Sequence, residues 1–176
     1  TRTASIAAFD SVAIEWIVIA GMIVGSLPFA HYLAIVRGGW KPLLQDPQVR
    51  WFLALLASVV VVLIWYLSND GMPVSVAIRQ ASFNAVSIMT GTGYGSANFS
   101  AWGGFASTLL LIAMFIGGCG GSTTCGIKVF RLQVLATTAR VQIGRLLRPH
   151  AVILAYYNRR PVANEVMDSV MGFFYL

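Results

Sequence analysis

Six consecutive residues of this chain, Thr90–Gly95, read TGTGYG and could bind a cation through their backbone. Glycine adopts backbone angles that other residues resist, so successive carbonyl groups of such a segment can turn toward one axis. Carbonyl oxygens arranged in this way can replace the water around an ion. The best ion ligands are the carbonyls of Gly91, Thr92 and Gly93, with the Thr90 hydroxyl as a further oxygen. The full candidate set is Thr90, Gly91, Thr92, Gly93, Tyr94 and Gly95.

A short polar helix is predicted over Val74–Met89, directly before this segment. Its 16 residues cover about 24 Å, and with Arg79 and Asn84 among them they are too few and too polar for a lipid-facing crossing. We expect a re-entrant helix whose C-terminal partial negative charge faces a bound cation. TGTGYG is also close to the TVGYG filter pattern of potassium channels. An external turn between two membrane helices remains the alternative.

A second glycine-rich segment, Gly117–Gly126, reads GGCGGSTTCG. It lies between a short apolar run, Trp102–Ile116, and a predicted helix, Ile127–Leu147, so we interpret the three pieces as one helix with an unwound middle. The interrupting residues are Gly117, Gly118, Cys119, Gly120, Gly121, Ser122, Thr123, Thr124, Cys125 and Gly126. Close helix packing is the alternative role of these glycines.

Lys128 and Arg131 follow this segment one helical turn apart. Both are candidates to act on it, although extension of the two side chains to the membrane interface is the favoured interpretation. We interpret Cys119 and Cys125 as small, reduced packing residues, because their spacing and number fit neither a zinc site nor a disulfide framework.

The elements around these segments belong to a membrane protein by composition. Of 176 residues, 57% are hydrophobic and 10% are charged, and the mean hydropathy is +0.75. Soluble domains carry about a quarter charged residues, so an ordinary soluble protein is excluded, as is a disordered one. The length allows three or four crossings, the first two over Val12–Val36 and Trp51–Leu67.

Charge distribution predicts the orientation of these crossings. The connector between them carries Arg37, Lys41 and Arg50, whereas the Ser68–Pro73 turn has no cation, so the connector is expected on the cytoplasmic side. The net charge of +6 reflects the same asymmetry and not nucleic-acid binding, because most cations follow the apolar region. Those cations are Lys128, Arg131, Arg140, Arg145, Arg148, Arg159 and Arg160.

Other polar side chains favour structural roles. Glu15, His31 and Arg79 are expected to form interfacial or inter-helix contacts, Arg79 with a carbonyl or a carboxylate. No catalytic set of nucleophile, base and acid is present, so no enzyme is expected. The apolar run that opens at Asn164 stops in mid-pattern at Leu176, and the chain starts at Thr1 without Met, so we expect a piece of a longer protein.

The sequence SFNAVSIMTGTGYG, followed by FIGGCGGSTTCGIKVFRLQVL, resembles the Trk/Ktr/HKT superfamily of potassium transporters, and most closely its bacterial TrkH-type pore subunits. The resemblance implies an all-α integral membrane protein built from M1–pore helix–filter–M2 repeats, here with a Gly-interrupted inner helix. Residues 1–50 would hold a crossing of the preceding repeat and a cytoplasmic connector. Residues 51–148 would form one complete pore repeat, and 149–176 a connector and the start of the next helix.

The resemblance also implies a function and partners. It makes Gly117–Gly126 an intramembrane gate and Gly93 the glycine that accompanies potassium selectivity, with potassium as the transported ion and no organic cofactor. Other expected partners are lipid, the remaining repeats, a second copy of the protein and a cytosolic nucleotide-binding subunit of the TrkA type, at the bacterial inner membrane. Two alternatives stay open: a single-repeat channel that assembles as a homotetramer, and a non-conducting membrane scaffold.

Overall fold

The computed structural model of the chain describes residues 5–9, 11–147, 156–157, 160–161 and 164–175. It contains two compact units, Thr1–Lys128 and Val129–Leu176. In both units the described elements are helices, apart from one pair of two-residue strands in the second unit. The expected all-α class is therefore confirmed.

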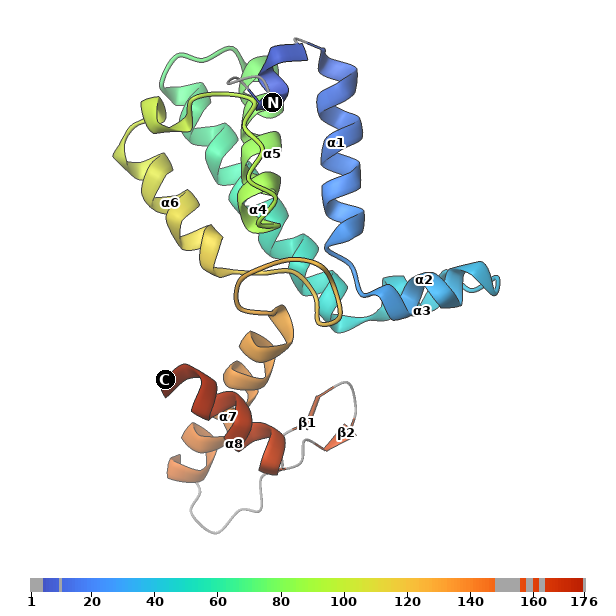
Figure 1. Ribbon diagram of the computed structural model, residues 1–176. Coiled ribbons are helices and arrows are strands. Elements are labelled where there is room, and N and C mark those ends of the chain that lie inside the picture. Colours follow the sequence, from blue (N-terminus) through green and yellow to red (C-terminus); the bar gives the residue numbers. More distant parts are fainter. Residues whose placement is uncertain (1–4, 10, 148–155, 158–159, 162–163, 176) are drawn as a thin grey trace. The chain divides into compact units, whose positions relative to one another are not determined.

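Helix α5 (Val74–Met89) lies at the centre of the first unit (Figure 1). It packs against α4 (Pro47–Asn69), α1 (Val12–Gly25) and α6 (Gly104–Phe115), and most of its C-terminal half is buried. Short 3-10 turns, η1 (Ser5–Phe9) and η2 (Phe99–Trp102), complete this bundle. The helix predicted over Val74–Met89 is thus confirmed, with the same bounds.

Helix α4 is the element that best fits a membrane crossing. Its 23 residues measure about 35 Å, and within the described residues it is the helix long and apolar enough by itself to span a bilayer. It contains the predicted crossing Trp51–Leu67. One stripe at helical spacing is buried against its neighbours, made up of Val49, Phe52, Leu56, Val59, Leu63 and Leu67.

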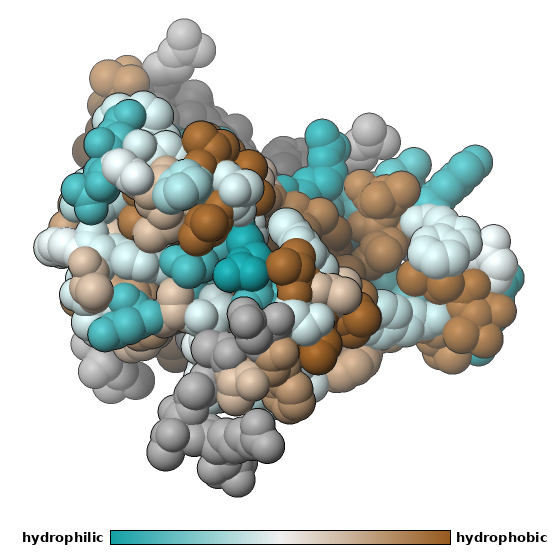
Figure 2. All heavy atoms as spheres, turned by 90° about the horizontal axis from the view of Figure 1, so that it is seen from above, coloured by the Kyte–Doolittle hydropathy of each residue, from teal (hydrophilic) through white to brown (hydrophobic). Residues whose placement is uncertain are grey.

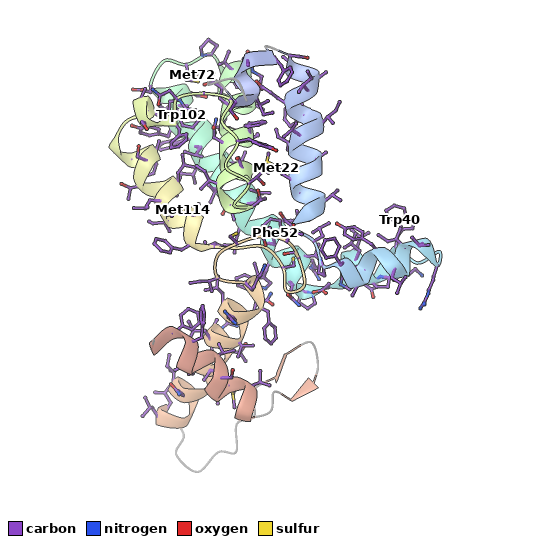
Figure 3. The ribbon with its side chains drawn as sticks, in the orientation of Figure 1. Met22, Trp40, Phe52, Met72, Trp102 and Met114 are labelled. Carbon is purple, nitrogen blue, oxygen red and sulfur yellow. The ribbon has the colours of Figure 1, made fainter. Side chains whose placement is uncertain are left out.

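Apolar side chains also cover outward faces of this unit. Val61 and Trp65 of α4 are 63% and 65% exposed, and Leu111 and Phe115 of α6 are 54% and 58% exposed. Seen from above, hydrophobic side chains lie at the surface among hydrophilic ones (Figure 2). Phe52 points into the bundle, whereas Trp40 lies outside it (Figure 3). Apolar faces of this extent indicate contact with lipid or with further protein.

The first predicted crossing, Val12–Val36, is wrong as a single helix. The chain bends by 99° between α1 and α2 (Phe29–Val36), and α3 (Lys41–Gln45) follows. Pro28 is the physical reason, because proline has no N–H to donate and its ring collides with the preceding turn of a helix. The hydrophobic pattern continues through Pro28 even though the helix does not.

The second unit contains α7 (Val129–Leu147), α8 (Asn164–Tyr175) and the antiparallel strands β1 (Tyr156–Tyr157) and β2 (Arg160–Pro161). Helices α7 and α8 pack together, and the guanidinium carbon of Arg131 lies 3.9 Å from the ring centroid of Phe173. Helices are thus found where Ile127–Leu147 and Asn164–Leu176 were predicted. The boundaries of the predicted repeat, at residues 50 and 148, stay a prediction, and 148 lies outside the described residues.

An ion pair joins α1 to α5. Glu15, which is 5% exposed, places its Oε2 atom 3.4 Å from Nε of Arg79. Neither atom makes a hydrogen bond, so the attraction is one of charge. This contact confirms the expectation that Arg79 meets a carboxylate, and it leaves Glu15 neutralised inside the bundle.

Replacing one partner of this pair should destabilise the protein more than replacing both. In the full-length protein we expect Glu15→Gln to lower the free energy of unfolding by about 2 kcal/mol, because it leaves the Arg79 cation without a counter-charge. The double variant with Arg79→Gln should cost less than the sum of the two single variants. Thermal unfolding of detergent-purified protein measures this, and strictly additive losses would contradict the pair.

Candidate functional site

The TGTGYG segment begins at the C-terminal end of helix α5. Thr90 caps the helix, and the chain then turns back beside it, as Figure 1 shows. The amide of Thr92 donates to the carbonyl of Ser87 at 3.0 Å, and the hydroxyl of Ser87 donates to the carbonyl of Tyr94 at 2.6 Å. One turn earlier, the Asn84 amide group donates to the hydroxyl of Ser96 at 3.1 Å. The helix thus holds the segment by its own side chains.

Two glycines give the segment an alternating backbone. Gly91 and Gly93 have φ values of +69° and +77°, whereas Thr92 and Tyr94 between and after them have ordinary negative values. In an extended chain whose φ values all have one sign, successive carbonyl groups point to opposite sides. A change in the sign of φ at every second residue lets successive carbonyl groups point to the same side. These two positions therefore need glycine, as the sequence pattern indicated.

The carbonyl oxygens of Gly91, Thr92 and Gly93 accept no hydrogen bond from the described part of the chain. All three residues are exposed, so the oxygens are free to bind a ligand. The carbonyl of Tyr94 is already engaged by Ser87. The Thr90 hydroxyl is buried and shares a 2.7 Å hydrogen bond with the Thr92 hydroxyl, so this predicted oxygen is also engaged.

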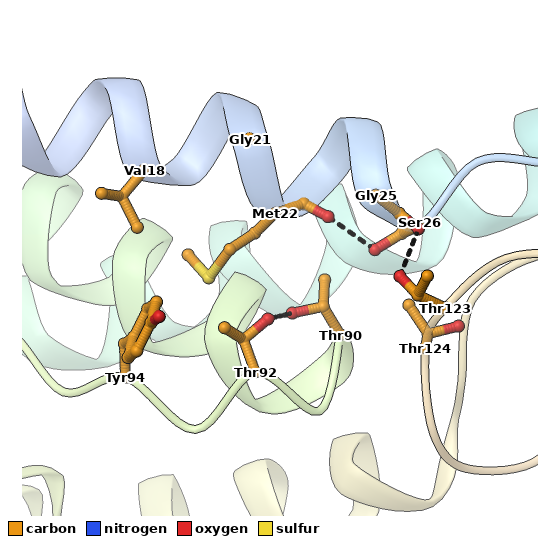
Figure 4. Close-up of a pocket in the computed structure, with 10 residues that line it drawn as sticks. All are labelled: Val18, Gly21, Met22, Gly25, Ser26, Thr90, Thr92, Tyr94, Thr123 and Thr124. Atoms are coloured by element: carbon orange, nitrogen blue, oxygen red, sulfur yellow. Dashed lines mark hydrogen bonds between the residues drawn. The ribbon is translucent and has the colours of Figure 1, made fainter. Parts of the chain in front are cut away.

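A cavity of about 350 Å³ lies between the segment and helix α1 (Figure 4). Helix α1 forms one wall with Val18 and Met22, and the TGTGYG segment faces it with Thr90, Thr92 and Tyr94. Thr123 and Thr124 of the second glycine-rich segment close one end. The structure thus brings the two glycine-rich segments of the sequence to one cavity.

Gly117–Gly126, the glycine loop, is an unwound segment between α6 and α7, as predicted. Its neck is closed by two backbone hydrogen bonds of 2.9 Å, from Gly117 to the carbonyl of Ile127 and from Ile127 to the carbonyl of Phe115. A methyl group at Gly117 would overlap the Cys125 carbonyl oxygen. Glycine is thus required where the two ends of the loop meet.

The glycine loop also contacts the TGTGYG segment. A Cβ atom at Gly91 would lie 3.1 Å from the Cβ of Cys125, which is tighter than ordinary packing. Both cysteines are free, as expected; Cys119 is buried, whereas Cys125 is exposed although it lies against Gly91. Any movement of the loop at Cys125 therefore changes the packing beneath Gly91.

Lys128 folds back over the glycine loop. Its ammonium group donates to the carbonyl of Ser122 at 3.3 Å, to the hydroxyl of Thr124 at 3.3 Å and to the carbonyl of Thr124. The Lys128 ammonium group is thus bound to the glycine loop, which is one of the two roles expected from the sequence, and its extension to the membrane interface stays a prediction. Arg131 belongs to the second unit and contacts Phe173 there.

Several residues of the site were not singled out from the sequence. Ser87 and Asn84 lie three residues apart on α5, a spacing that places both on one helix face and could have marked them. Ser26 and Gln48 also contact the glycine loop, through hydrogen bonds from Cys119 and Gly120. No local pattern identifies these two, because their partners lie 93 and 72 positions away.

The apolar outer faces, the α4 span and the short buried helix that ends in the TGTGYG segment are typical of an α-helical integral membrane protein. Comparison with known proteins gives the family. The TrkH family model, described as cation transport protein, matches residues 1–176, and the chain belongs to this family. It is a family of membrane transporters and not of enzymes, in agreement with the expectation from the sequence.

Individual relatives agree. The chain is 38% identical over 152 residues to the Trk system potassium uptake protein TrkI of Halomonas elongata, covering 86% of this chain and 31% of that protein. It is 31% identical over 177 residues to TrkH of Escherichia coli K12, covering 99% of this chain and 37% of that protein. The crystal structure of the potassium transporter TrkH from Vibrio parahaemolyticus matches with a TM-score of 0.91 and 33% identity, over 99% of this chain and 38% of that one. The chain thus spans about a third of the length of these relatives.

Alanine at the neck of the glycine loop should destabilise the protein. In the full-length protein we expect Gly117→Ala to lower the free energy of unfolding by about 2 kcal/mol, because its methyl group overlaps the Cys125 carbonyl. Gly104→Ala is the matched control, since Gly104 begins α6 and a Cβ there meets nothing within 4 Å. Thermal unfolding compares the two, and equal midpoints would contradict the described neck.

Proposed function

We propose that this chain forms one pore-lining part of a potassium uptake protein, in which the TGTGYG segment is one strand of a selectivity filter. The observation that carries the proposal is the set of three carbonyl oxygens, of Gly91, Thr92 and Gly93, that have no protein donor in the described residues. The positive φ values at Gly91 and Gly93 permit the three carbonyl oxygens to point to the same side of the backbone, at the C-terminal end of α5. The partial negative charge of that helix end favours a cation.

In this mechanism an ion exchanges part of its water for these carbonyls and moves on by weak binding at several sites. The Tyr94 carbonyl is left out of the ligand set, because Ser87 already donates to it. One strand cannot surround an ion, so the remaining ligands must come from other repeats. A chain that spans about a third of its relatives favours this arrangement over a single-repeat homotetramer.

We further propose that the glycine loop gates conduction. It lines the same cavity as the TGTGYG segment, and its Cys125 packs against Gly91. Irregular backbone at membrane depth is tolerated where it lines a cavity, and its glycines leave it few side chains to anchor it. Loop movement would then open or block the path next to the filter.

The printed names of the relatives, which are potassium uptake proteins of Trk systems, support a proposal for partners and location. We propose a homodimer in the bacterial inner membrane, regulated by a cytosolic nucleotide-binding subunit of the TrkA type. The basic stretch Arg140–Arg160 is the candidate docking region, and its central part lies outside the described residues. Arg140 is exposed at the C-terminal half of α7, which is compatible with this role.

Serine at the second filter glycine should weaken ion selectivity. Gly93→Ser in the full-length protein places a Cβ at φ +77°, a strain of about 1–3 kcal/mol that the backbone relieves by moving its carbonyl. We expect the preference for potassium over sodium to fall about tenfold in flux measurements on proteoliposomes. Gly71→Ser is the matched control, because Gly71 also has a positive φ, of +91°, and open space around it but lies outside the TGTGYG segment. An unchanged preference in Gly93→Ser would show the filter assignment to be wrong.

Shortening the glycine loop should increase flux. Deleting residues 120–123 removes the part that faces α1 and α4, while the neck formed by Gly117 and Ile127 stays. We expect faster rubidium uptake into proteoliposomes, because less backbone obstructs the path. Unchanged or abolished uptake by a variant that elutes as a single folded species would count against the gate.

A further inference from the structure

The position of the glycine loop is set by contacts outside the loop itself. We propose that Gln48 and the elbow between α1 and α2 (Gly25–Phe29) form a latch that holds the loop closed, with Gln48 as its positioning residue. This inference rests on the proposed gate and identifies the groups that regulate it. All contacts that carry it lie within the first unit.

The elbow offers the loop the backbone groups that a broken helix leaves unpaired. In a continuous helix the amide of Phe29 would donate to the carbonyl of Gly25. Here the Phe29 amide donates to the carbonyl of Gly121 at 3.1 Å, and the Gly25 carbonyl accepts from the hydroxyl of Thr123 at 3.0 Å. The loop therefore replaces a helical hydrogen bond that Pro28 interrupts.

A second hydrogen-bonded contact between the elbow and the loop lies one residue further along the chain, at Ser26. The carbonyl of Ser26 accepts a 3.1 Å hydrogen bond from the amide of Cys119, and Ser26 is fully buried. Its own hydroxyl donates to the Met22 carbonyl at 2.7 Å, which fixes the last turn of α1. Three residues of the loop are thus bonded to a rigid elbow, and release of the loop must leave these elbow groups without partners.

Gln48 of α4 supplies a side-chain contact to the loop. Its Oε1 atom accepts a 2.8 Å hydrogen bond from the amide of Gly120. The Gln48 backbone is fixed in turn, because its amide donates to Oδ1 of Asp46 at 2.7 Å. Oδ2 of Asp46 lies 2.6 Å from Nε2 of His31 on α2. Gln48 is therefore anchored through Asp46 to helix α2, which follows the elbow.

This arrangement makes Gln48 the part of the latch that a substitution can remove cleanly. The elbow bonds to its partners mainly through backbone groups, which substitutions leave in place. Gln48 contacts the loop with one acceptor atom, and it is not among the residues that line the cavity beside the TGTGYG segment. Loss of one net hydrogen bond shifts an equilibrium roughly fivefold, so the population of released loop should rise by about that factor.

The test uses the full-length protein in proteoliposomes. Gln48→Met keeps the length of the side chain and removes the acceptor, so we expect basal rubidium flux to rise about fivefold with an unchanged preference for potassium over sodium. Gln48→Glu keeps an oxygen acceptor and should stay close to wild type. Gln48→Asn, whose shorter amide does not reach Gly120, is the second variant if Gln48→Met folds poorly. Gln45→Met, on the exposed surface of α3, is the matched control and should change nothing.

A labelling experiment reads the loop directly. Cys119 is fully buried and Cys125 is exposed. Site-resolved mass spectrometry after maleimide treatment should therefore show labelling of Cys119 accelerated in Gln48→Met, with Cys125 as the internal reference. A merely structural role of Gln48 would lower the unfolding temperature without this selective acceleration.

The outcomes separate the latch from the gate. If deletion of residues 120–123 raises flux but Gln48→Met changes neither flux nor Cys119 labelling, the latch is wrong and the gate stands. If neither variant raises flux, both proposals are wrong. A flux increase and faster Cys119 labelling in Gln48→Met, together with wild-type behaviour of Gln48→Glu and Gln45→Met, support the latch.

Discussion

Backbone that leaves a helix at membrane depth must find partners for its N–H and C=O groups, because lipid offers none. Both glycine-rich segments of this protein, which we propose to lie at membrane depth, meet this constraint with hydrogen bonds to other parts of the chain. The glycine loop bonds to the carbonyl and amide groups that the interrupted helix α1–α2 leaves free. The TGTGYG segment bonds to α5 on one side, through Ser87 and Asn84, and leaves three carbonyls open on the other. The functional proposal depends on this difference between paired and unpaired carbonyls, because a carbonyl oxygen without a hydrogen-bond donor can bind a cation.

The same constraint explains why the break in α1–α2 matters. The 99° bend at Pro28 separates the Phe29 amide from the Gly25 carbonyl, and these two groups would pair in a continuous helix. The glycine loop supplies a hydrogen-bond partner for each of these groups, so the two irregular segments pair with each other. Glycine is needed where they meet, since a Cβ at Gly118 would lie 2.9 Å from the Ser26 carbonyl. The loop is thus deformable in itself but held by its surroundings.

Prediction from the sequence succeeded where the signal was local. Helix α5 was found with its bounds because its polar composition, its length and the glycines that follow it all mark one element. The positive φ values at Gly91 and Gly93 follow from the same local pattern. Prediction failed at Val12–Val36 as a single helix, where a mostly apolar run continues through Pro28, and it did not reveal the contacts of the Lys128 ammonium group. The direction of that ammonium group depends on loop carbonyls whose positions no spacing in the sequence reveals.

The sequence by itself determined the membrane class, the short polar helix Val74–Met89 and the two segments that could do chemistry, because hydropathy, helix length and glycine content act over short stretches. Only the tertiary structure decided which atoms of those segments are free. It engaged the Tyr94 carbonyl and the Thr90 hydroxyl, left the carbonyls of Gly91–Gly93 open, and placed Cys125 under Gly91. It also brought Gln48 to Gly120 across 72 positions. Hydrogen-bond partners at such separations depend on how the helices pack against one another, and no local sequence pattern determines that packing.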